Sequence, residues 1–271
     1  MEKLPVYYAL TIEKTAMLGG TTLPCLMVVG DKDGKIKGNY VVKVFGQKHI
    51  EQYNPTNKEI FANILADYLD IFVPKAALIY VDEELIEVLK SSPQYHKVEL
   101  KAGYYFGSEY LENCLSYEQR HLWNYDKWLN IESIFAFDIL LRNFDRRVGK
   151  PNILFGNEAL VLIDHDLSLD IQKSFQDYAE FDSYKNVVDG VKGKHIFLDY
   201  LIDKNKTKAI NFGSFIEYLL YYFDYDCLDS VVEQLHSLEF EIDDFFRIKS
   251  YLLEVKKYHL DFQEILKKLI T

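Results

Sequence analysis

Three side chains that could handle a phosphate group and a divalent cation lie within one short stretch of the sequence. Asp145 stands at the start of a loop that contains a glycine and a proline, Asn152 follows it, and Asp164 closes an apolar run. Mg²⁺ prefers hard oxygen ligands and leaves its other positions to water and phosphate oxygens. A further carboxylate can orient an attacking hydroxyl and accept its proton. The stretch therefore indicates phosphoryl transfer, with Asn152 and Asp164 as metal ligands and Asp145 as the base.

The residues between them predict how these side chains meet. Residues 153–155 and 160–163 have the pattern of two strands of a β-hairpin. Because a hairpin returns the chain to its starting point, the two metal ligands are expected to be neighbours within reach of Asp145. The competing interpretation is a surface loop in which Asp145 and Arg146 form a local ion pair. For Asp145 taken alone, that interpretation would be the better one.

Lys43 lies in a predicted strand, on the face that also carries Val41 and Phe45. A lysine among apolar neighbours needs an anionic partner, because an unpaired buried charge is costly. Glu59 on the following helix could supply it, and so could a nucleotide phosphate. Glu59 has a competing role as the capping-box glutamate of Thr56, which is the more ordinary one at this spacing. Lys43 could equally lie on a solvated strand face.

Gly19, Gly20, Thr21 and Thr22 precede the first long apolar run. Glycines at this place would let backbone N–H groups approach phosphates, and the threonine hydroxyls could add donors. The segment matches neither the Walker pattern nor the spacing Gly-x-Gly-x-x-Gly. An ordinary turn before a strand would look the same, so the segment supports a phosphate site only together with the other motifs.

The predicted elements divide the chain into a strand-rich half and a helix-rich half. Strands are expected at 23–29, 39–45 and 103–106, and a strand pair interrupted by Pro74 at 71–81. One helix is expected after Pro55, within the strand-rich half. Further helices are expected at 126–144, which has an amphipathic pattern, and at 214–223, 228–238 and 243–270. This order predicts an α+β protein with two lobes and a boundary near residues 107–113.

Composition narrows the classes of partner. The chain has 271 residues and a net charge of −11, which argues against a broad surface for nucleic acid or for an anionic membrane. Its three cysteines are far apart and indicate neither a disulfide framework nor a metal site. No apolar run reaches 18 residues and the first residues lack a signal-peptide core, so a cytoplasmic location is expected.

Taken in order, these segments resemble the HipA-like kinase domain, in particular its shorter stand-alone branch. The wider superfamily, which includes the phosphatidylinositol kinases, is similar at the same places. The resemblance covers residues 18 to about 169, more than half of the chain. It rests on the segments 19–24 (Gly-Gly-Thr-Thr-Leu-Pro), 40–44 (Tyr-Val-Val-Lys-Val), 57–59 (Asn-Lys-Glu), 73–74 (Val-Pro), 107–111 (Gly-Ser-Glu-Tyr-Leu), 143–146 (Asn-Phe-Asp-Arg), 151–154 (Pro-Asn-Ile-Leu) and 162–165 (Leu-Ile-Asp-His).

The resemblance implies a bilobal protein-kinase-like fold that uses ATP and Mg²⁺, with an N-lobe at 1–107 and a C-lobe at 108–271. Asp145 would be the catalytic base, and Asn152 and Asp164 the metal ligands. The loop of Gly19, Gly20, Thr21 and Thr22 would bind the phosphates of the nucleotide. Lys43 would hold the α- and β-phosphates, and Glu59 would orient Lys43. The adenine would form hydrogen bonds with the backbone of Glu109, Tyr110 and Leu111.

Two positions depart from the pattern of protein and lipid kinases. Asn152 stands seven residues after Asp145, where five is usual, so the loop is longer. Asp166 occupies a place where a glycine often follows the metal-binding aspartate. Its carboxylate could hold a second metal ion or be an N-cap for the following segment, and the cap is the favoured interpretation.

A kinase acting on Ser or Thr hydroxyls of a protein is the function these features favour. A lipid kinase is the first alternative, disfavoured by the acidic charge and by the lack of a polybasic or membrane-inserting segment. A non-catalytic nucleotide-binding module is the second, although every catalytic position carries a chemically competent residue. HipA-like proteins often act as toxins restrained by an antitoxin-like protein, which is the partner that the resemblance suggests, and the acidic charge predicts no direct nucleic-acid binding.

Overall fold

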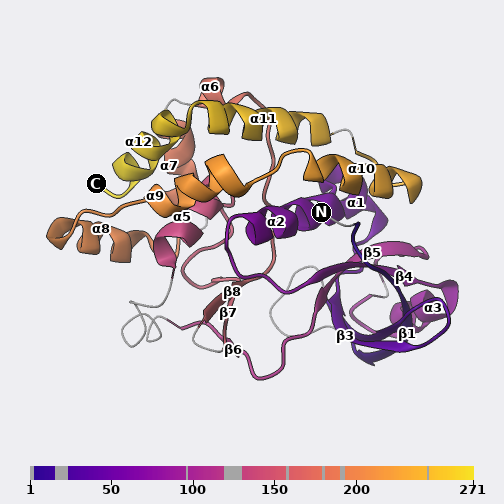
Figure 1. Ribbon diagram of the computed structural model, residues 1–271. Coiled ribbons are helices and arrows are strands. Elements are labelled where there is room, and N and C mark those ends of the chain that lie inside the picture. The colour runs from indigo at the N-terminus through magenta and orange to yellow at the C-terminus, as the bar shows by residue number, and fades with distance from the viewer. Residues whose placement is uncertain are drawn as a thin grey trace.

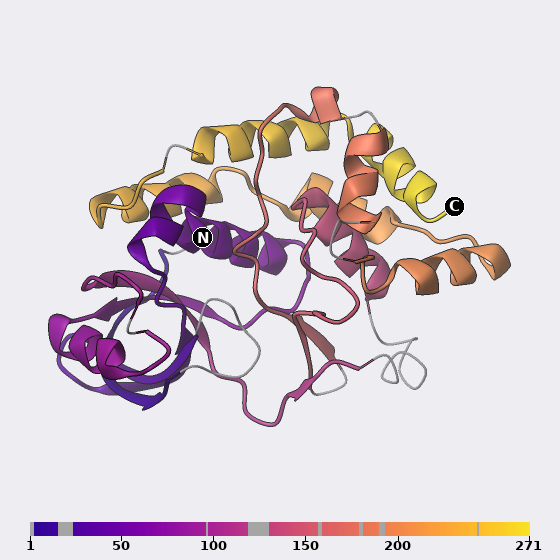
Figure 2. The ribbon, with the colours of Figure 1, turned by 180° about the vertical axis from the view of Figure 1, so that it is seen from behind.

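The computed structural model describes residues 3–15, 24–95, 97–118, 130–156, 159–178, 181–189, 193–242 and 244–271. The segment of Gly19, Gly20, Thr21 and Thr22, predicted to bind phosphate, lies outside these residues. A β-rich N-terminal part and a helical C-terminal part lie side by side in Figures 1 and 2. Within the described residues, no helix is both long and apolar enough to cross a membrane.

Five strands close into a barrel in the N-terminal part, in the order β1-β2-β3-β5-β4. Only the β1–β4 pairing is parallel. Apolar side chains from alternate strand positions fill the interior, as the two-residue period of a strand requires. The strands are β1 (Val6–Lys14), β2 (Cys25–Gly30), β3 (Ile36–Val42), β4 (Ala76–Val81) and β5 (Gly103–Glu109).

The strand pair predicted at 71–81 is wrong, because this segment forms the single strand β4. The residues around Pro74 run outside any strand, and proline cannot donate the N–H that a ladder needs. The carbonyl of Pro74 instead accepts a hydrogen bond from Asn63 Nδ2 at 2.8 Å, which ties the segment to the helix before it.

Helix α1 (Gln47–Tyr53) is followed directly by helix α2 (Pro55–Tyr68). The N-cap of α2 is Asn54 in a left-handed conformation, so Thr56 lies inside the first turn. The capping box of Thr56 with Glu59 is therefore wrong. Most of α2 is buried, and its apolar residues belong to the same core as the C-terminal helices, as in the contact of Phe61 with Phe245 at 5.6 Å between ring centroids.

The helical part is built around α5 (Ile131–Leu140). All of its residues except Glu132 are buried, so the amphipathic pattern predicted for 126–144 does not hold over the described part of that segment. A helix that is apolar on all sides is one that other helices surround. The further helices are α3 (Glu83–Ser91), which packs on the barrel, and α6 (Phe175–Tyr178), α7 (Phe181–Asp189), α8 (Leu198–Thr207), α9 (Gly213–Glu217), the π-helix η1 (Tyr218–Tyr222), α10 (Cys227–Ser237), α11 (Phe245–Lys257) and α12 (His259–Leu269).

The single helix predicted at 243–270 is also wrong, because it is two helices, α11 and α12. Tyr258 separates them with a non-helical backbone conformation. The break lets both helices bury an apolar face: Leu252 and Val255 lie on α11, and Phe262 and Leu266 on α12. One straight helix could not keep both faces on a rounded core.

A small second sheet connects the two parts. Its strands are β6 (Leu115–Ser116), β7 (Ile153–Gly156) and β8 (Ala159–Leu162), and β7 and β8 form the expected antiparallel pair with Ile153 opposite Leu162. Figure 1 shows this sheet beside the barrel and below the helices.

The burial of α5 predicts how strongly single side chains contribute to stability. Phe135→Ala should lower the free energy of unfolding by about 3–5 kcal/mol, because Phe135 is fully buried and its removal leaves a cavity. The matched control is Phe246→Ala, since Phe246 is 72% exposed, and its effect should stay within about 0.5 kcal/mol. Urea unfolding followed by circular dichroism measures both. Equal losses in the two variants would contradict the central position of α5.

Candidate active site

A cleft with a cavity of about 340 Å³ lies between the barrel and the small sheet. One part of its lining is apolar and the other carries charged and polar side chains. The apolar lining includes Val41, Phe106, Leu154, Leu162 and Ile163, and the polar lining includes Lys43, Glu59, Asn152, Asp164 and His165. A cavity of this size with one apolar part and a few convergent polar groups is typical of a small-molecule site.

Lys43 follows the last residue of β3, and its N–H donates to the carbonyl of Phe106 at 3.1 Å. Its ammonium contacts Glu59 Oε1 and lies 2.5 Å from Asp164 Oδ1. Burial opposes the charge of Lys43, but Glu59 and Asp164 outweigh it and raise the pKa of the lysine. The expected ion pair between Lys43 and Glu59 is therefore present, and Lys43 does not lie on a solvated face.

Lys150 is a second lysine of the site, which sequence reasoning missed. Its ammonium contacts Asp145 Oδ2 and lies 3.2 Å from Asp164 Oδ2. Burial works against the charged form, but the carboxylates of Asp164 and Asp145 prevail and raise its pKa. The sequence places Lys150 in the same loop as Asp145, a signal that could have marked it. Only the fold of that loop decides that it points inward.

The hairpin brings Asn152 and Asp164 together as predicted. The N–H of Ile163 donates to the carbonyl of Asn152 at 3.1 Å, directly beyond the β7–β8 pairing. Asn152 and Asp164 both adopt left-handed backbone conformations, with φ of 50° and 65°. Asparagine and aspartate tolerate this region better than most residues. Asn152 Nδ2 lies 3.3 Å from Asp145 Oδ2, so the three predicted side chains form one group.

A buried polar network supports this loop from below. Arg146 Nε donates to Asp138 Oδ2 at 2.7 Å, and both side chains are fully buried. Arg146 also reaches the carbonyl of Asn152, and its terminal nitrogen lies 3.0 Å from His165 Nε2. The local ion pair of Asp145 with Arg146 is therefore absent. Burial disfavours the charge on Asp138, yet Arg146 and His195 overcome it and lower its pKa.

The hydrogen bonds of this network fix the protons of its two histidines. Arg146 can only donate, so His165 Nε2 accepts and its Nδ1 carries the proton, 3.8 Å from Glu59 Oε2. His195 Nδ1 accepts from the N–H of Phe197 at 3.2 Å, so its Nε2 donates to Asp138 Oδ2 at 3.1 Å. Each ring thereby has a single tautomer, and the network connects α5 with Glu59 of α2.

The side chain of Asn143 connects Asp138 to Asp145, the predicted catalytic base. Its Nδ2 donates to Asp138 Oδ1 at 2.9 Å, and its Oδ1 accepts the N–H of Asp145 at 3.1 Å. Sequence reasoning did not identify Asp138 or His195. A lone aspartate in the apolar run of α5 was an available signal for the first, whereas nothing in the sequence brings His195 beside it.

Glu59, Asp164 and Asp166 form an acidic cluster, with ligand atoms all within 4.8 Å of one another. Burial raises the pKa of Asp166 to about 7, and the nearby carboxylates of Asp164 and Glu59 add to the effect of burial although Lys43 opposes it. The helix cap expected of Asp166 is wrong, because the next helix, α6, begins only at Phe175. Crowded hard oxygen donors with excess negative charge suit a divalent cation such as Mg²⁺.

The segment of Glu109, Tyr110 and Leu111 lines the cavity as predicted for an adenine contact. Two of its N–H groups are already engaged: Glu109 donates to the carbonyl of Lys75 at 2.9 Å, and Tyr110 to that of Asn39 at 2.8 Å. The N–H of Leu111 is therefore the donor of this segment that we expect to meet a nucleotide base.

The fold and the site together define a protein-kinase-like protein. The family model of the HipA-like kinases matches residues 17–207, and the chain belongs to this family. The structure is similar to the crystal structure of a Helicobacter pylori proinflammatory kinase, CtkA, with a TM-score of 0.52 over 96% of this chain and 95% of that chain, at 14% sequence identity. Among curated proteins, none matches the sequence. The chain is thus a HipA-like kinase, a phosphotransferase, with an α+β kinase fold.

The buried Asp138–Arg146 pair predicts a large stability effect. Asp138→Asn leaves the guanidinium of Arg146 buried without its counter-charge, so the free energy of unfolding should fall by about 3–5 kcal/mol. Asp199→Asn breaks the exposed pair with Lys194 and should cost less than about 1 kcal/mol. Urea unfolding of both variants at one pH measures the contrast. A loss below 1 kcal/mol for Asp138→Asn would show that the network tolerates an unpaired arginine.

The raised pKa of Asp166 predicts a pH-dependent stability. In the folded, metal-free protein the carboxyl holds its proton up to a pH of about 7, whereas in the unfolded chain it loses it near 3.8. Asp166 therefore costs stability increasingly as the pH rises from about 4 to 7, and the full cost remains above that range. Asp166→Asn should stabilise the protein above pH 7, and the gain should shrink as the pH is lowered.

Urea unfolding of wild type and Asp166→Asn in EDTA, between pH 5 and 8.5, measures this difference. The exposed Asp203→Asn is the control and should change stability by less than about 0.5 kcal/mol at any pH. A gain from Asp166→Asn that is the same at every pH would mean that the carboxyl titrates alike in the folded and unfolded states.

Proposed function

We propose that this kinase transfers the γ-phosphoryl group of ATP, with Mg²⁺, to a Ser or Thr hydroxyl of a protein. The observation that carries the proposal is the continuous set of ion pairs at one end of the cleft, from Glu59 through Lys43, Asp164 and Lys150 to Asp145. Catalysis of phosphoryl transfer depends mainly on positioning the reacting groups and on stabilising the charge that develops on the transferred phosphoryl group. A row of alternating charges beside an apolar slot provides both.

The nucleotide has a matching place for each of its parts. The apolar lining around Val41, Phe106 and Leu162 suits the adenine ring, and the N–H of Leu111 suits one of its nitrogens. Lys43 would bind the α- and β-phosphates while Glu59 keeps its ammonium in the cleft. The loop of Gly19, Gly20, Thr21 and Thr22 stays a predicted phosphate contact.

Asn152 and Asp164 would hold Mg²⁺, and the acidic cluster with Glu59 and Asp166 supports a cation at this place. The ion, when bound, neutralises charge on the phosphates. Both oxygens of Asp164 now face lysines, Oδ1 toward Lys43 and Oδ2 toward Lys150. Metal ligation by this carboxylate would compete with its two lysine contacts, and the phosphates would offer either ammonium a second anionic partner.

Asp145 would orient the acceptor hydroxyl and take its proton. Its Oδ2 is engaged by Lys150 and Asn152, and its Oδ1 lies 3.7 Å from Arg147 Nε. Lys150 would shift from Asp145 toward the transferred phosphoryl group when nucleotide binds, which frees the base and counters the developing charge. The hydrogen bond from Asn143 would hold the backbone of Asp145 during this exchange.

A protein acceptor is favoured over a lipid by the net charge of −11, which would repel an anionic membrane surface. A lipid acceptor and a non-catalytic nucleotide-binding module are the alternatives. A restraining antitoxin-like partner and a lobe boundary near residue 107 remain predictions from the resemblance. Incubation with γ-labelled ATP and Mg²⁺, with a cell lysate or with phosphatidylinositol vesicles as acceptor, separates the candidate substrates.

The assigned roles predict different defects for two carboxylate variants. Asp145→Asn removes the proton acceptor, so the rate of transfer should fall by about 10²–10⁴-fold while ATP binding persists. Asp164→Asn removes a charge beside the metal and the phosphates, so it should weaken Mg²⁺-dependent ATP binding as well as turnover. Calorimetric titration of Mg²⁺·ATP, in parallel with the transfer assay, measures both.

The outcomes separate the assignments. Loss of nucleotide binding in Asp145→Asn with intact binding in Asp164→Asn would mean that the two roles are exchanged. A wild-type protein that binds no ATP, or variants that change no transfer, would leave the interaction module as the better description. Asp203→Asn, on an exposed helix surface, is the control that should match wild type in both assays.

A further inference from the structure

A second cavity, of about 490 Å³, lies outside the cleft. One wall is the segment 44–49, which leads from β3 into α1, and the other is formed by Tyr95, Lys97, Val98 and Glu99, which lie between α3 and β5 in the sequence. The N–H of Gln47 donates to the carbonyl of Glu99 at 2.9 Å and joins the two walls. They approach closely at Gly46, where an added Cβ would lie 2.6 Å from Val98 Cγ1.

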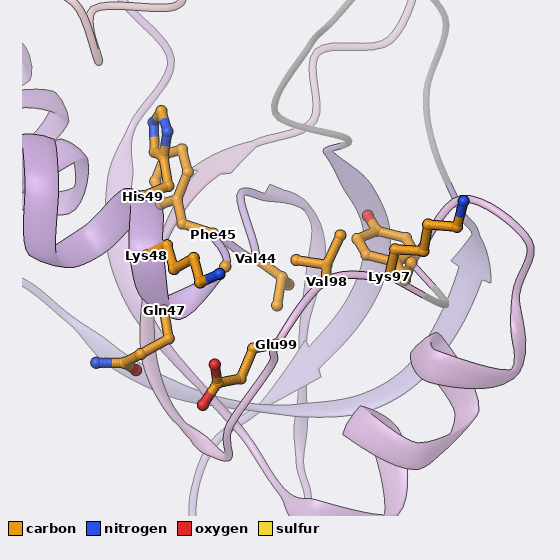
Figure 3. Close-up of a pocket in the computed structure, with 10 residues that line it drawn as sticks. Val44, Phe45, Gln47, Lys48, His49, Lys97, Val98 and Glu99 are labelled. Carbon is orange, nitrogen blue, oxygen red and sulfur yellow. The ribbon is translucent and has the colours of Figure 1, made fainter.

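The floor of this cavity is apolar. Val44 and Phe45, each 2% exposed, lie in one wall, and the half-buried Val98 lies in the other (Figure 3). Tyr95, 1% exposed, belongs to the same wall as Val98. The hydroxyl of Tyr95 lies 2.8 Å from Cys25 Sγ. Because the hydroxyl is engaged there, the part of Tyr95 that lines the cavity is its ring. A ligand that fills the floor therefore needs an apolar body.

The rim of this cavity carries charged side chains. Lys48 and Lys97 are exposed and stand on opposite walls, and the Glu99 carboxylate lies on the side of Lys48 in Figure 3. Over the residues that the structure describes, neither lysine forms an ion pair or a side-chain hydrogen bond. Two such ammonium groups against one carboxylate leave a net positive rim, which favours an anionic group on the ligand.

We propose that this cavity is a second ligand site of the kinase, for a small molecule with an apolar body and one anionic group, a carboxylate or a phosphate. The volume is within the range of natural small-molecule sites, and an apolar floor with few polar groups is their usual composition. The apolar body binds over Val44 and Val98, and the anionic group binds at Lys48 and Lys97.

The site lies back to back with the cleft. Lys43 lines the cleft, whereas the next residue, Val44, lines the second cavity. His49 of α1 also lines the second cavity and stacks on Phe45 at 5.4 Å between ring centroids. Its Nε2 is buried without a hydrogen-bond partner among the described residues and lies 3.9 Å from Asp166 Oδ2.

A bound ligand therefore contacts the segment that carries Lys43 and the helix that faces the acidic cluster. The proposal extends to coupling: if the ligand binds the nucleotide-bound and nucleotide-free forms of this segment with different affinity, it changes the affinity for Mg²⁺·ATP, and Mg²⁺·ATP changes the ligand's affinity by the same factor. This consequence rests on the proposed function, whereas the existence of the site does not.

Fluorescence titration with 8-anilinonaphthalene-1-sulfonate, an amphipathic anion, tests the site directly. Val98→Trp should abolish the saturable signal by filling the cavity, and the double variant Lys48→Glu/Lys97→Glu should weaken binding at least tenfold. Two controls should bind as wild type does: Lys101→Glu, an exposed lysine outside the cavity, and Leu154→Trp, which fills the cleft instead. Circular dichroism establishes that each variant is folded.

Competition identifies the anionic group. Displacement of the probe by phenylacetate assigns a carboxylate and displacement by phenyl phosphate a phosphate, while neutral phenylacetamide should displace nothing. The site is refuted if charge reversal leaves the affinity unchanged, if Leu154→Trp rather than Val98→Trp removes the signal, or if neither anion displaces the probe.

Calorimetric titration of Mg²⁺·ATP with and without the displacing anion tests the coupling. The dissociation constant should change at least about fivefold in wild type and not in Val98→Trp. An unchanged constant in wild type refutes the coupling. A chain that binds no ATP refutes the proposed function and the coupling together, while the probe titration still decides whether the second site exists.

Discussion

The buried ion pair between Asp138 and Arg146 is the interaction on which the rest of the site depends. A charge in a fully buried position is stable only when its partner and its hydrogen bonds are complete. Arg146 meets this condition by reaching Asp138, the carbonyl of Asn152 and His165 at once. The backbone of the loop is thereby fixed to α5, in which every residue except Glu132 is buried.

The same network explains why two separate parts of the fold meet at one point. His165 accepts from Arg146 through its side chain and donates to Glu59 Oε1 through its backbone N–H at 3.0 Å. Glu59 in turn contacts Lys43 at the end of the barrel. An unbroken series of polar contacts thus leads from the core of the helical part to the barrel.

Charge crowding is the other constraint. Glu59, Asp164 and Asp166 are close enough to disfavour full ionisation, and the two lysines between and beside them reduce but do not remove the excess. The pKa of Asp164 is lowered, against the effect of burial, by Lys43 and Lys150, whereas that of Asp166 is raised. Two neighbouring carboxyl groups of one cluster therefore have pKa values shifted in opposite directions. Such shifted pKa values are typical of functional sites.

The sequence by itself determined the local features: the hairpin that joins Asn152 to Asp164, the helix of Glu59, the family, and a strand near Lys43. That strand was predicted to include Lys43 and Phe45, whereas β3 ends at Val42. The local features follow from periodicity, turn residues and motif order, which are properties of short segments. Only the tertiary structure decided that Glu59 faces Lys43 rather than capping its helix, that Asp166 joins an acidic cluster, and that 243–270 forms two helices. It also brought Lys150, Asp138 and His195 into the site. The reason is physical, because a side chain's partner depends on which distant segments pack around it, and no short segment carries that information.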